Sequence, residues 1–300
     1  MTTLMIFGLG YSSQATLRAA AGRYDRVIAT VRTAESAARF SAEGVSGQPV
    51  TALPFDGTGL SETLAAAIGT ADDILVSAPP DETGDPVLKH CADTLAARRP
   101  RAVAYLSTVG VYGDHGGGWV DETTAPKPVS PRSVERLEAE AAWTAFGRSA
   151  GVPVSLLRLS GIYGPGNNAL VNVRRGTARR IIKPGQVFNR IHVDDIAAAV
   201  LASFDTRFDG IVNVTDDEPA PAQDVVAYAA ELLGLPVPPD IPIEAAGLSP
   251  MGLSFYGECK RVANRRLKDE LSVNLKHPNF RMALRALAAG GDGQTHRQDS

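Results

Sequence analysis

Residues 4–17 read Leu-Met-Ile-Phe-Gly-Leu-Gly-Tyr-Ser-Ser-Gln-Ala-Thr-Leu, and this stretch decides the fold. Its apolar start has the length and composition of a buried strand, Gly8 and Gly10 break that strand, and a polar turn then opens a helix. A strand, a glycine turn and a helix together direct free backbone N–H groups and the positive end of a helix dipole toward a diphosphate. Gly8 permits the tight turn, and Gly10 keeps a Cβ out of the path of the phosphates.

The turn matches the pattern Gly-x-Gly-x-x-Gly except at its third small position, which is Ser13. It lies between a strand and a helix, which is where a dinucleotide-binding turn belongs. We therefore expect Leu9, Tyr11 and Ser12 to contact a dinucleotide together with the two glycines. The alternative is a glycine turn that serves only packing.

Strand patterns alternate with helix patterns along the chain, which indicates an α/β fold with a Rossmann-type, doubly wound parallel sheet. The expected strands are 4–7, 26–32, 50–55, 73–78, 101–106, 154–159 and 211–215. The pattern then loosens, and we expect a smaller C-terminal α/β substrate lobe. The predicted domains are a dinucleotide-binding domain (1–165, with 187–218 returning to it), a substrate lobe (166–287) and a flexible tail (288–300).

Ligands of such sheets lie at the carboxyl ends of the strands. The residues that follow those ends, and that we expect to converge on the cofactor or substrate, are Arg32, Asp56, Ser77, Ala78, Pro79 and Thr108. Proteins that prefer NAD place an acid at the end of the second strand, and this chain has Arg32 near that point. Because a guanidinium suits a 2′-phosphate, NADP is expected in preference to NAD. The alternative is a solvated arginine in a surface turn.

Composition excludes several classes of partner. The formal net charge of -3 gives no general attraction to nucleic acid or anionic membranes. No leader and no apolar run of membrane-spanning length is evident. Cys91 and Cys259 lie far apart, which favours reduced thiols and a cytoplasmic location. The histidines are scattered, so no metal site is expected.

Several ordered motifs carry a family resemblance: the glycine turn, Ser107-Thr108 with Val111-Tyr112-Gly113, and the segments 158–166, 191–197 and 213–219. Together they resemble the extended short-chain dehydrogenase/reductase superfamily, in particular its NAD-dependent epimerase/dehydratase group. The resemblance implies a Rossmann cofactor domain and a smaller C-terminal substrate lobe. It often implies a homodimer, built here through helices 86–99 and 132–147.

The resemblance also implies a catalytic Ser/Thr, Tyr and Lys set. Thr108 matches the Ser/Thr that binds the substrate oxygen, but the register puts Arg132 where the tyrosine belongs and Arg136 where the lysine belongs. An arginine stays protonated, so Arg132 is no proton shuttle and is expected to bind substrate instead. Arg136 has the donors and charge to hold the cofactor ribose and assist catalysis. The pattern resembles an atypical branch that keeps the cofactor fold and lacks the catalytic pair.

Other side chains are candidates to replace that pair or to bind substrate. Tyr112 is a candidate catalytic residue, and His115, beside three glycines, is a candidate acid–base group; the alternatives are a packed tyrosine and a solvated histidine. Tyr163 and Arg190 are expected at the substrate. The arginines between 173 and 180 either bind an anionic substrate or form a solvated helix face. Asp195 is expected to cap the helix 196–204, with His192 buried.

Two functions remain open. The first is an NADP(H)-dependent oxidoreductase or epimerase-like enzyme that acts on a small anionic carbonyl or sugar-type substrate through a non-standard proton donor. The second is a catalytically inactive nicotinamide-cofactor sensor or regulatory protein.

Overall fold

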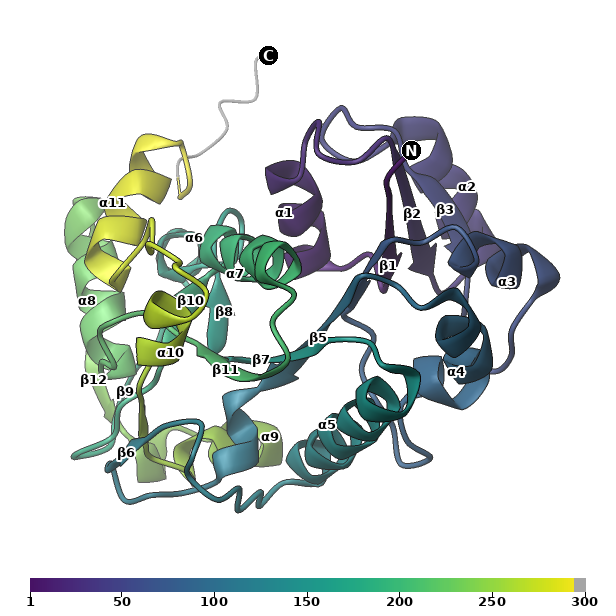
Figure 1. The fold of residues 1–300 in the computed structure, drawn as a ribbon. Coiled ribbons are helices and arrows are strands. Elements are labelled where there is room, and N and C mark those ends of the chain that lie inside the picture. Colours follow the sequence, from purple (N-terminus) through teal and green to yellow (C-terminus); the bar gives the residue numbers. More distant parts are fainter. Residues whose placement is uncertain (294–300) are drawn as a thin grey trace, which may run out of the picture.

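The computed structural model describes residues 1–293, and its centre is one sheet of seven parallel strands (Figure 1). The strands are β1 (Thr3–Phe7), β2 (Arg26–Val31), β3 (Thr51–Pro54), β4 (Asp73–Val76), β5 (Ala102–Thr108), β7 (Val154–Leu159) and β11 (Gly210–Val214). Their order is β11-β7-β5-β4-β1-β2-β3. The strand order therefore reverses between β1 and β4, where such sheets bind their ligands. The predicted Rossmann-type α/β fold is confirmed.

Helices cover both faces of this sheet (Figure 1). The helices on one face are α1 (Tyr11–Ala19), α2 (Ala34–Glu43) and α7 (Val193–Thr206), and those on the other are α3 (Glu62–Ile68), α4 (Pro86–Arg98) and α5 (Pro131–Ala150). Within β1, Leu4 and Ile6 enter one core while Met5 and Phe7 enter the other. This double burial explains why the strands read as unbroken apolar runs. In the described part of the chain, no helix combines the length and apolarity needed to cross a membrane.

The C-terminal part is smaller and mixes helices with short strand pairs. Its helices α6 (Ala169–Arg174), α8 (Ala222–Leu232) and α11 (Phe280–Ala289) pack around a core of their own. The remaining short elements are η1 (Val109–Tyr112), η2 (Ile243–Ala245), α9 (Pro250–Tyr256) and α10 (Arg265–Asp269). The strand pairs are β8 (Gly161–Tyr163) with β10 (Arg190–His192), β9 (Arg180–Ile182) with β12 (Asp240–Pro242), and β6 (Trp119–Val120) with β13 (Arg261–Val262).

The predicted domain limits and the homodimer stay predictions. The predicted tail begins inside α11, which ends at Ala289. Beyond that helix, Asp292 Oδ2 accepts hydrogen bonds from Gly166 N at 2.9 Å and from Asn168 Nδ2 at 2.5 Å. Residues 294–300 of the predicted tail lie outside the described residues.

The predicted cap of α7 is wrong. His192 is the N-cap, and its Nδ1 accepts a hydrogen bond from Asp194 N at 3.1 Å. The Asp195 carboxylate instead accepts the backbone amides of Lys276 and His277, at 2.7 and 3.1 Å. Asp195 therefore holds the segment that precedes α11 rather than its own helix.

Candidate functional site

The glycine turn after β1 is held tightly on the sheet. Gly8 has φ +90°, and Gly8 N donates to Thr30 Oγ1 at 3.0 Å. A Cβ on Gly8 would lie 2.9 Å from Ala78 N, so the turn and the end of β4 approach each other as closely as glycine allows. Ser77 N and Ala78 N both donate to Phe7 O, which places these predicted cofactor residues against the turn.

The outer side of the same turn is open. A Cβ on Gly10 would meet no atom of the described chain within 4 Å, and α1 begins without a side-chain cap. The first amides of α1 are therefore left for a ligand, which fits the diphosphate of a dinucleotide. Ser13, in the third small position, is buried, and its hydroxyl donates to Gly8 O at 2.8 Å. Its hydroxyl thus closes the turn from inside.

The neighbours of the turn have different roles. The side chains of Leu9 and Ser12 are buried, so they face away from a ligand on the open side. Tyr11 is partly exposed, and its hydroxyl donates to Pro165 O at 3.0 Å. Burial raises the pKa of Tyr11 to about 12. Tyr11 therefore acts as a hydrogen-bond donor that ties the turn to the loop after β8.

Arg32 and Asp56 lie just beyond the carboxyl ends of β2 and β3. Arg32 directly follows β2, is exposed, and forms no ion pair with any described residue. Asp56 lies just beyond β3, and its Oδ1 accepts hydrogen bonds from Thr58 N and Oγ1 at 2.9 and 2.7 Å. The Thr58 hydroxyl holds the pKa of Asp56 below its usual range.

A cleft of about 1060 Å³ opens at the carboxyl ends of β4, β5 and β7. It brings together four predicted residues: Pro79, Thr108, Arg132 and Arg136. Arg136 Nη1 donates to Tyr105 Oη at 3.0 Å and to Leu106 O at 2.7 Å, which anchors this guanidinium on β5.

Thr108 shares its part of the cleft with a residue that sequence reasoning missed, Ser133. A Cβ on Gly110 would lie 3.3 Å from Thr108 Oγ1 and 2.8 Å from Ser133 Oγ. Two hydroxyls from β5 and α5 therefore flank one narrow space, which only glycine at 110 leaves open. Thr108 Oγ1 also accepts from Gly110 N at 3.0 Å and so caps η1.

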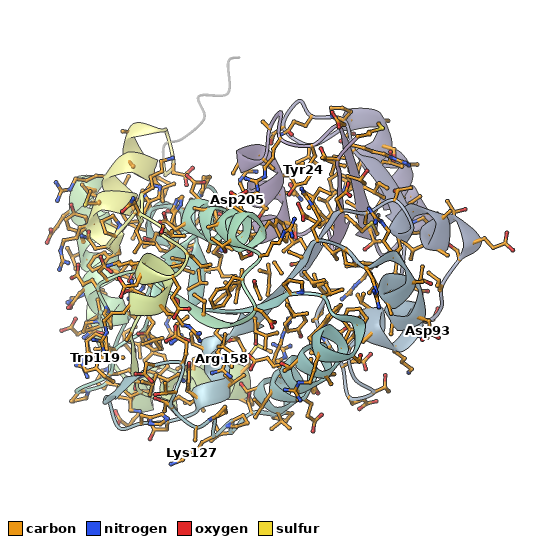
Figure 2. The ribbon with its side chains drawn as sticks, viewed as in Figure 1. Tyr24, Asp93, Trp119, Lys127, Arg158 and Asp205 are labelled. Carbon is orange, nitrogen blue, oxygen red and sulfur yellow. The ribbon has the colours of Figure 1, made fainter. Side chains whose placement is uncertain are left out.

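Tyr112 does not reach the cleft, contrary to its predicted catalytic role. Its side chain is fully buried, and its hydroxyl donates to Asn213 Oδ1 at 2.8 Å. The Arg158 guanidinium lies 4.8 Å from its ring centre, inside the molecule (Figure 2). Burial raises the pKa of Tyr112. The buried guanidinium of Arg158 needs favourable neighbours, and the Tyr112 ring and the Glu140 carboxylate provide them. This contact explains why Tyr112 lies in the core.

Tyr163 and Arg190 are also absent from the cleft. They line a separate hollow of about 340 Å³ beside α6 and α8. Arg190 Nη1 donates to Phe188 O and Ala220 O, each at 2.9 Å. Their strands β8 and β10 pair with each other and not with the main sheet. Gly161 of β8 lines the cleft, whereas Tyr163, two residues further on, lines the separate hollow. His115 Nε2 lies 3.1 Å from Tyr112 O and does not line the cleft either.

The C-terminal lobe supplies a cleft wall that sequence reasoning did not find. Lys260 lines the cleft and is 6% exposed. Its Nζ donates to Gly113 O at 2.8 Å and to Glu258 Oε2 at 2.6 Å. Met251 and Phe255 of α9 add apolar surface to the same wall. No spacing or motif in this segment marks these residues.

Two imidazoles and a carboxylate gather near the start of α7, in the group His192, Asp194 and His277. Burial lowers the pKa of His192 to about 4, so its ring is neutral. However, His192 Nδ1 already accepts from Asp194 N, and Lys276 Nζ donates to Asp194 Oδ2 at 2.9 Å. The cap and the ion pair engage His192 Nδ1 and the Asp194 carboxylate, while Nε2 of His192 and of His277 have no hydrogen-bond partner among the described residues. The expectation of no metal stays a prediction.

The sheet, the open turn and the adjoining cleft together form an α/β structure of the Rossmann type. Residues 87–214 match the model of the NAD dependent epimerase/dehydratase family. The match covers less than half of the chain, so its central part is similar to this family.

Known relatives share parts or all of the chain. A solved structure of a functionally unknown conserved protein from Silicibacter pomeroyi DSS is 45% identical, with a TM-score of 0.86, over 97% of this chain and 100% of that one. The 3-diazoavenalumate denitrifying reductase of a Streptomyces species is 31% identical over 53% of this chain and 54% of its own. Protein YeeZ of Escherichia coli K12 is 31% identical over 54% of this chain and 57% of its own. The chain thus spans about half the length of these curated relatives.

Proposed function

We propose that the protein is an NADP(H)-dependent oxidoreductase or epimerase that acts on a small anionic carbonyl or sugar-type substrate. One observation carries the proposal: the open turn at Gly10 and the hydroxyl of Thr108 follow the carboxyl ends of strands in one parallel sheet. A cofactor on the turn and a substrate in the cleft would therefore meet. The similarity to a reductase from Streptomyces supports a redox reaction.

The preference for NADP rests on Arg32. It is an exposed guanidinium directly after β2, and its charge suits a 2′-phosphate.

Different side chains of the cleft have different roles in the proposed reaction. A bound nicotinamide supplies or accepts the hydride. The Thr108 hydroxyl donates a hydrogen bond to the reacting substrate oxygen. Arg136, anchored on Tyr105 and Leu106, places positive charge where negative charge develops on that oxygen.

We assign the non-standard proton donor to Lys260. The two arginines of the cleft keep their protons, whereas a lysine ammonium can release one. Two of the three N–H groups of Lys260 bond to Gly113 O and Glu258, which leaves one for a substrate oxygen. In the reducing direction, the substrate oxygen receives the Lys260 proton, and the amine regains a proton from water.

The test is turnover of NADPH with a panel of aldehydes, ketones and nucleotide sugars. Lys260→Arg keeps the positive charge and cannot release a proton, so turnover should fall about a hundredfold or more while NADPH affinity is unchanged. Thr108→Ala should abolish turnover, whereas Arg132→Ala should raise KM for the anionic substrate. Full turnover in Lys260→Arg would remove the assignment of the proton donor.

One observation favours a second function, a cofactor-binding sensor without turnover. Arg132 and Arg136 line the cleft where the family resemblance expects a tyrosine and a lysine. If the wild-type protein binds NADPH tightly and oxidises it with no member of the panel, the sensor replaces the enzyme.

A further inference from the structure

We propose that the substrate has an apolar, ring-bearing body and a single carboxylate, and that it is not a nucleotide sugar. This inference rests on the proposed function and concerns the same cleft.

The walls of the cleft provide surface for an apolar body. On α9, Met251 and Phe255 line the cleft while 53% and 63% exposed. Phe188 also lines the cleft, and its ring makes an edge-to-face contact with Tyr256 of the same helix, with 5.2 Å between the ring centres. Large apolar side chains gathered at one cleft mark a surface that a ligand covers. A flat ring suits this surface because aromatic groups pack face to edge.

The charge of the cleft matches one anionic group. Arg136 is held by neutral oxygens, and Lys260 is paired with Glu258 at 2.6 Å. Arg132 is exposed at the cleft and forms no ion pair with any described residue. The side chains that line the cleft include three cations, Arg132, Arg136 and Lys260, and two acids, Glu135 and Glu258, so their formal charges leave one positive charge. Arg132 is the exposed guanidinium among them and can bind one carboxylate through two parallel hydrogen bonds.

Three other arginines that could neutralise a diphosphate bond to groups outside the cleft. Arg190 donates to two backbone oxygens beside the separate hollow. Arg180 forms an ion pair with Asp240 at 2.5 Å, and Arg174 Nε donates to Gly293 O at 2.6 Å. None of these three side chains lines the cleft. Because Glu135 and Glu258 offset two of the three cations that line the cleft, one net positive charge is left, which does not neutralise a nucleoside diphosphate.

The experiment is calorimetric titration of the full chain, with and without NADP⁺, using three probes. These are trans-cinnamate, cinnamamide (the same ring without the charge) and UDP-glucose. Cinnamate should bind at least about tenfold more tightly than cinnamamide, since a charge-assisted bidentate pair is lost in the amide. UDP-glucose should bind more weakly than cinnamate.

Two variants locate the contacts. Arg132→Gln should remove the difference between cinnamate and cinnamamide. Phe255→Ala should weaken both about tenfold, because it removes apolar contact area. Leu253→Ala is the matched control: Leu253 lies on the same helix, is 49% exposed and does not line the cleft, so binding should not change.

Tighter binding of UDP-glucose than of cinnamate, or equal effects of Phe255→Ala and Leu253→Ala, would overturn the proposal. NADPH binding, measured on the same samples by fluorescence, reports separately on the proposed function. A protein that binds cinnamate as expected and binds no NADPH would refute the cofactor and leave the substrate class standing.

Discussion

Arg158 Nη2 lies 2.7 Å from Glu140 Oε2 inside the protein, where the two side chains are only 2% and 3% exposed. Ser107 Oγ also donates to this carboxylate, at 2.5 Å, so the pair supports the strand that carries Thr108.

Replacement of Glu140 by glutamine keeps the shape and removes the charge that faces Arg158. The free energy of unfolding should fall by about 3 kcal/mol, because a buried guanidinium loses its counter-charge. Urea denaturation measures this. Glu138→Gln, on an exposed position of the same helix, should change stability by less than about 0.5 kcal/mol. Equal losses in the two variants would show that the buried pair contributes nothing.

Gly10→Val should fold normally and lose cofactor binding, because the space around its Cβ is open to the ligand and free of protein atoms. Gly8→Ala should instead lower the melting temperature, since φ +90° and contact with Ala78 N strain any side chain. NADPH fluorescence titration and thermal denaturation separate the two effects. Unchanged affinity in Gly10→Val would contradict the dinucleotide site.

Arg32→Gln should weaken NADPH binding about tenfold and leave NADH binding unchanged, because only NADPH carries the 2′-phosphate. Arg39→Gln removes the same charge from an exposed position on α2 and serves as the control. Parallel titrations with both cofactors give the answer. A loss shared equally by NADH and NADPH would argue against a 2′-phosphate contact.

Tyr112→Phe should keep NADPH binding and turnover, because the hydroxyl bonds to Asn213 in the core and not to a ligand. Stability should fall by about 1 kcal/mol for the lost buried hydrogen bond. Thr108→Ala provides the contrast, since it should affect turnover much more than folding. Loss of turnover in a well-folded Tyr112→Phe protein would restore the catalytic role predicted from sequence.

Burial raises the pKa of Asp216 to about 8, and the side chain is 1% exposed. The folded state therefore holds a proton that the unfolded chain releases above pH ~4, so stability falls as the pH rises from about 4 to about 8. The loss amounts to at most about 1.4 kcal/mol per pH unit.

Asp216→Asn cannot titrate, and its stability relative to wild type should increase across that window and level off above it. Urea unfolding at several pH values tests this, with Asp217→Asn as the more exposed neighbour. Parallel pH curves for wild type and Asp216→Asn would contradict a protonated Asp216.

The sheet and its turn were predictable because their signals are local. Strand β1 is buried on both faces, so it reads as a continuous apolar run, and Gly8 follows it at once. Thr108 and Arg136 reach the cleft because one ends a core strand and the other lies on the next long helix.

The rest of the site depends on partners that are distant in sequence. Tyr112 is buried with its hydroxyl donating a hydrogen bond to Asn213, 101 positions away. Lys260 enters the cleft by bonding to Gly113 O, 147 positions away. Tyr163 and Arg190 lie in two short strands that form a separate two-stranded sheet. The residues next to each partner in the sequence do not indicate these contacts. Motif position alone therefore misplaced Tyr112 and Tyr163 and did not identify Lys260.

The pairing of β6 with β13 joins residues 119–120 to 261–262 and brings Lys260 beside Gly113. During synthesis, the turn and its neighbouring strands emerge from the ribosome long before β13. A nascent chain arrested before residue 260 would already contain the glycine turn, Arg132 and Phe255, yet it would lack Lys260, to which we assign the proton transfer.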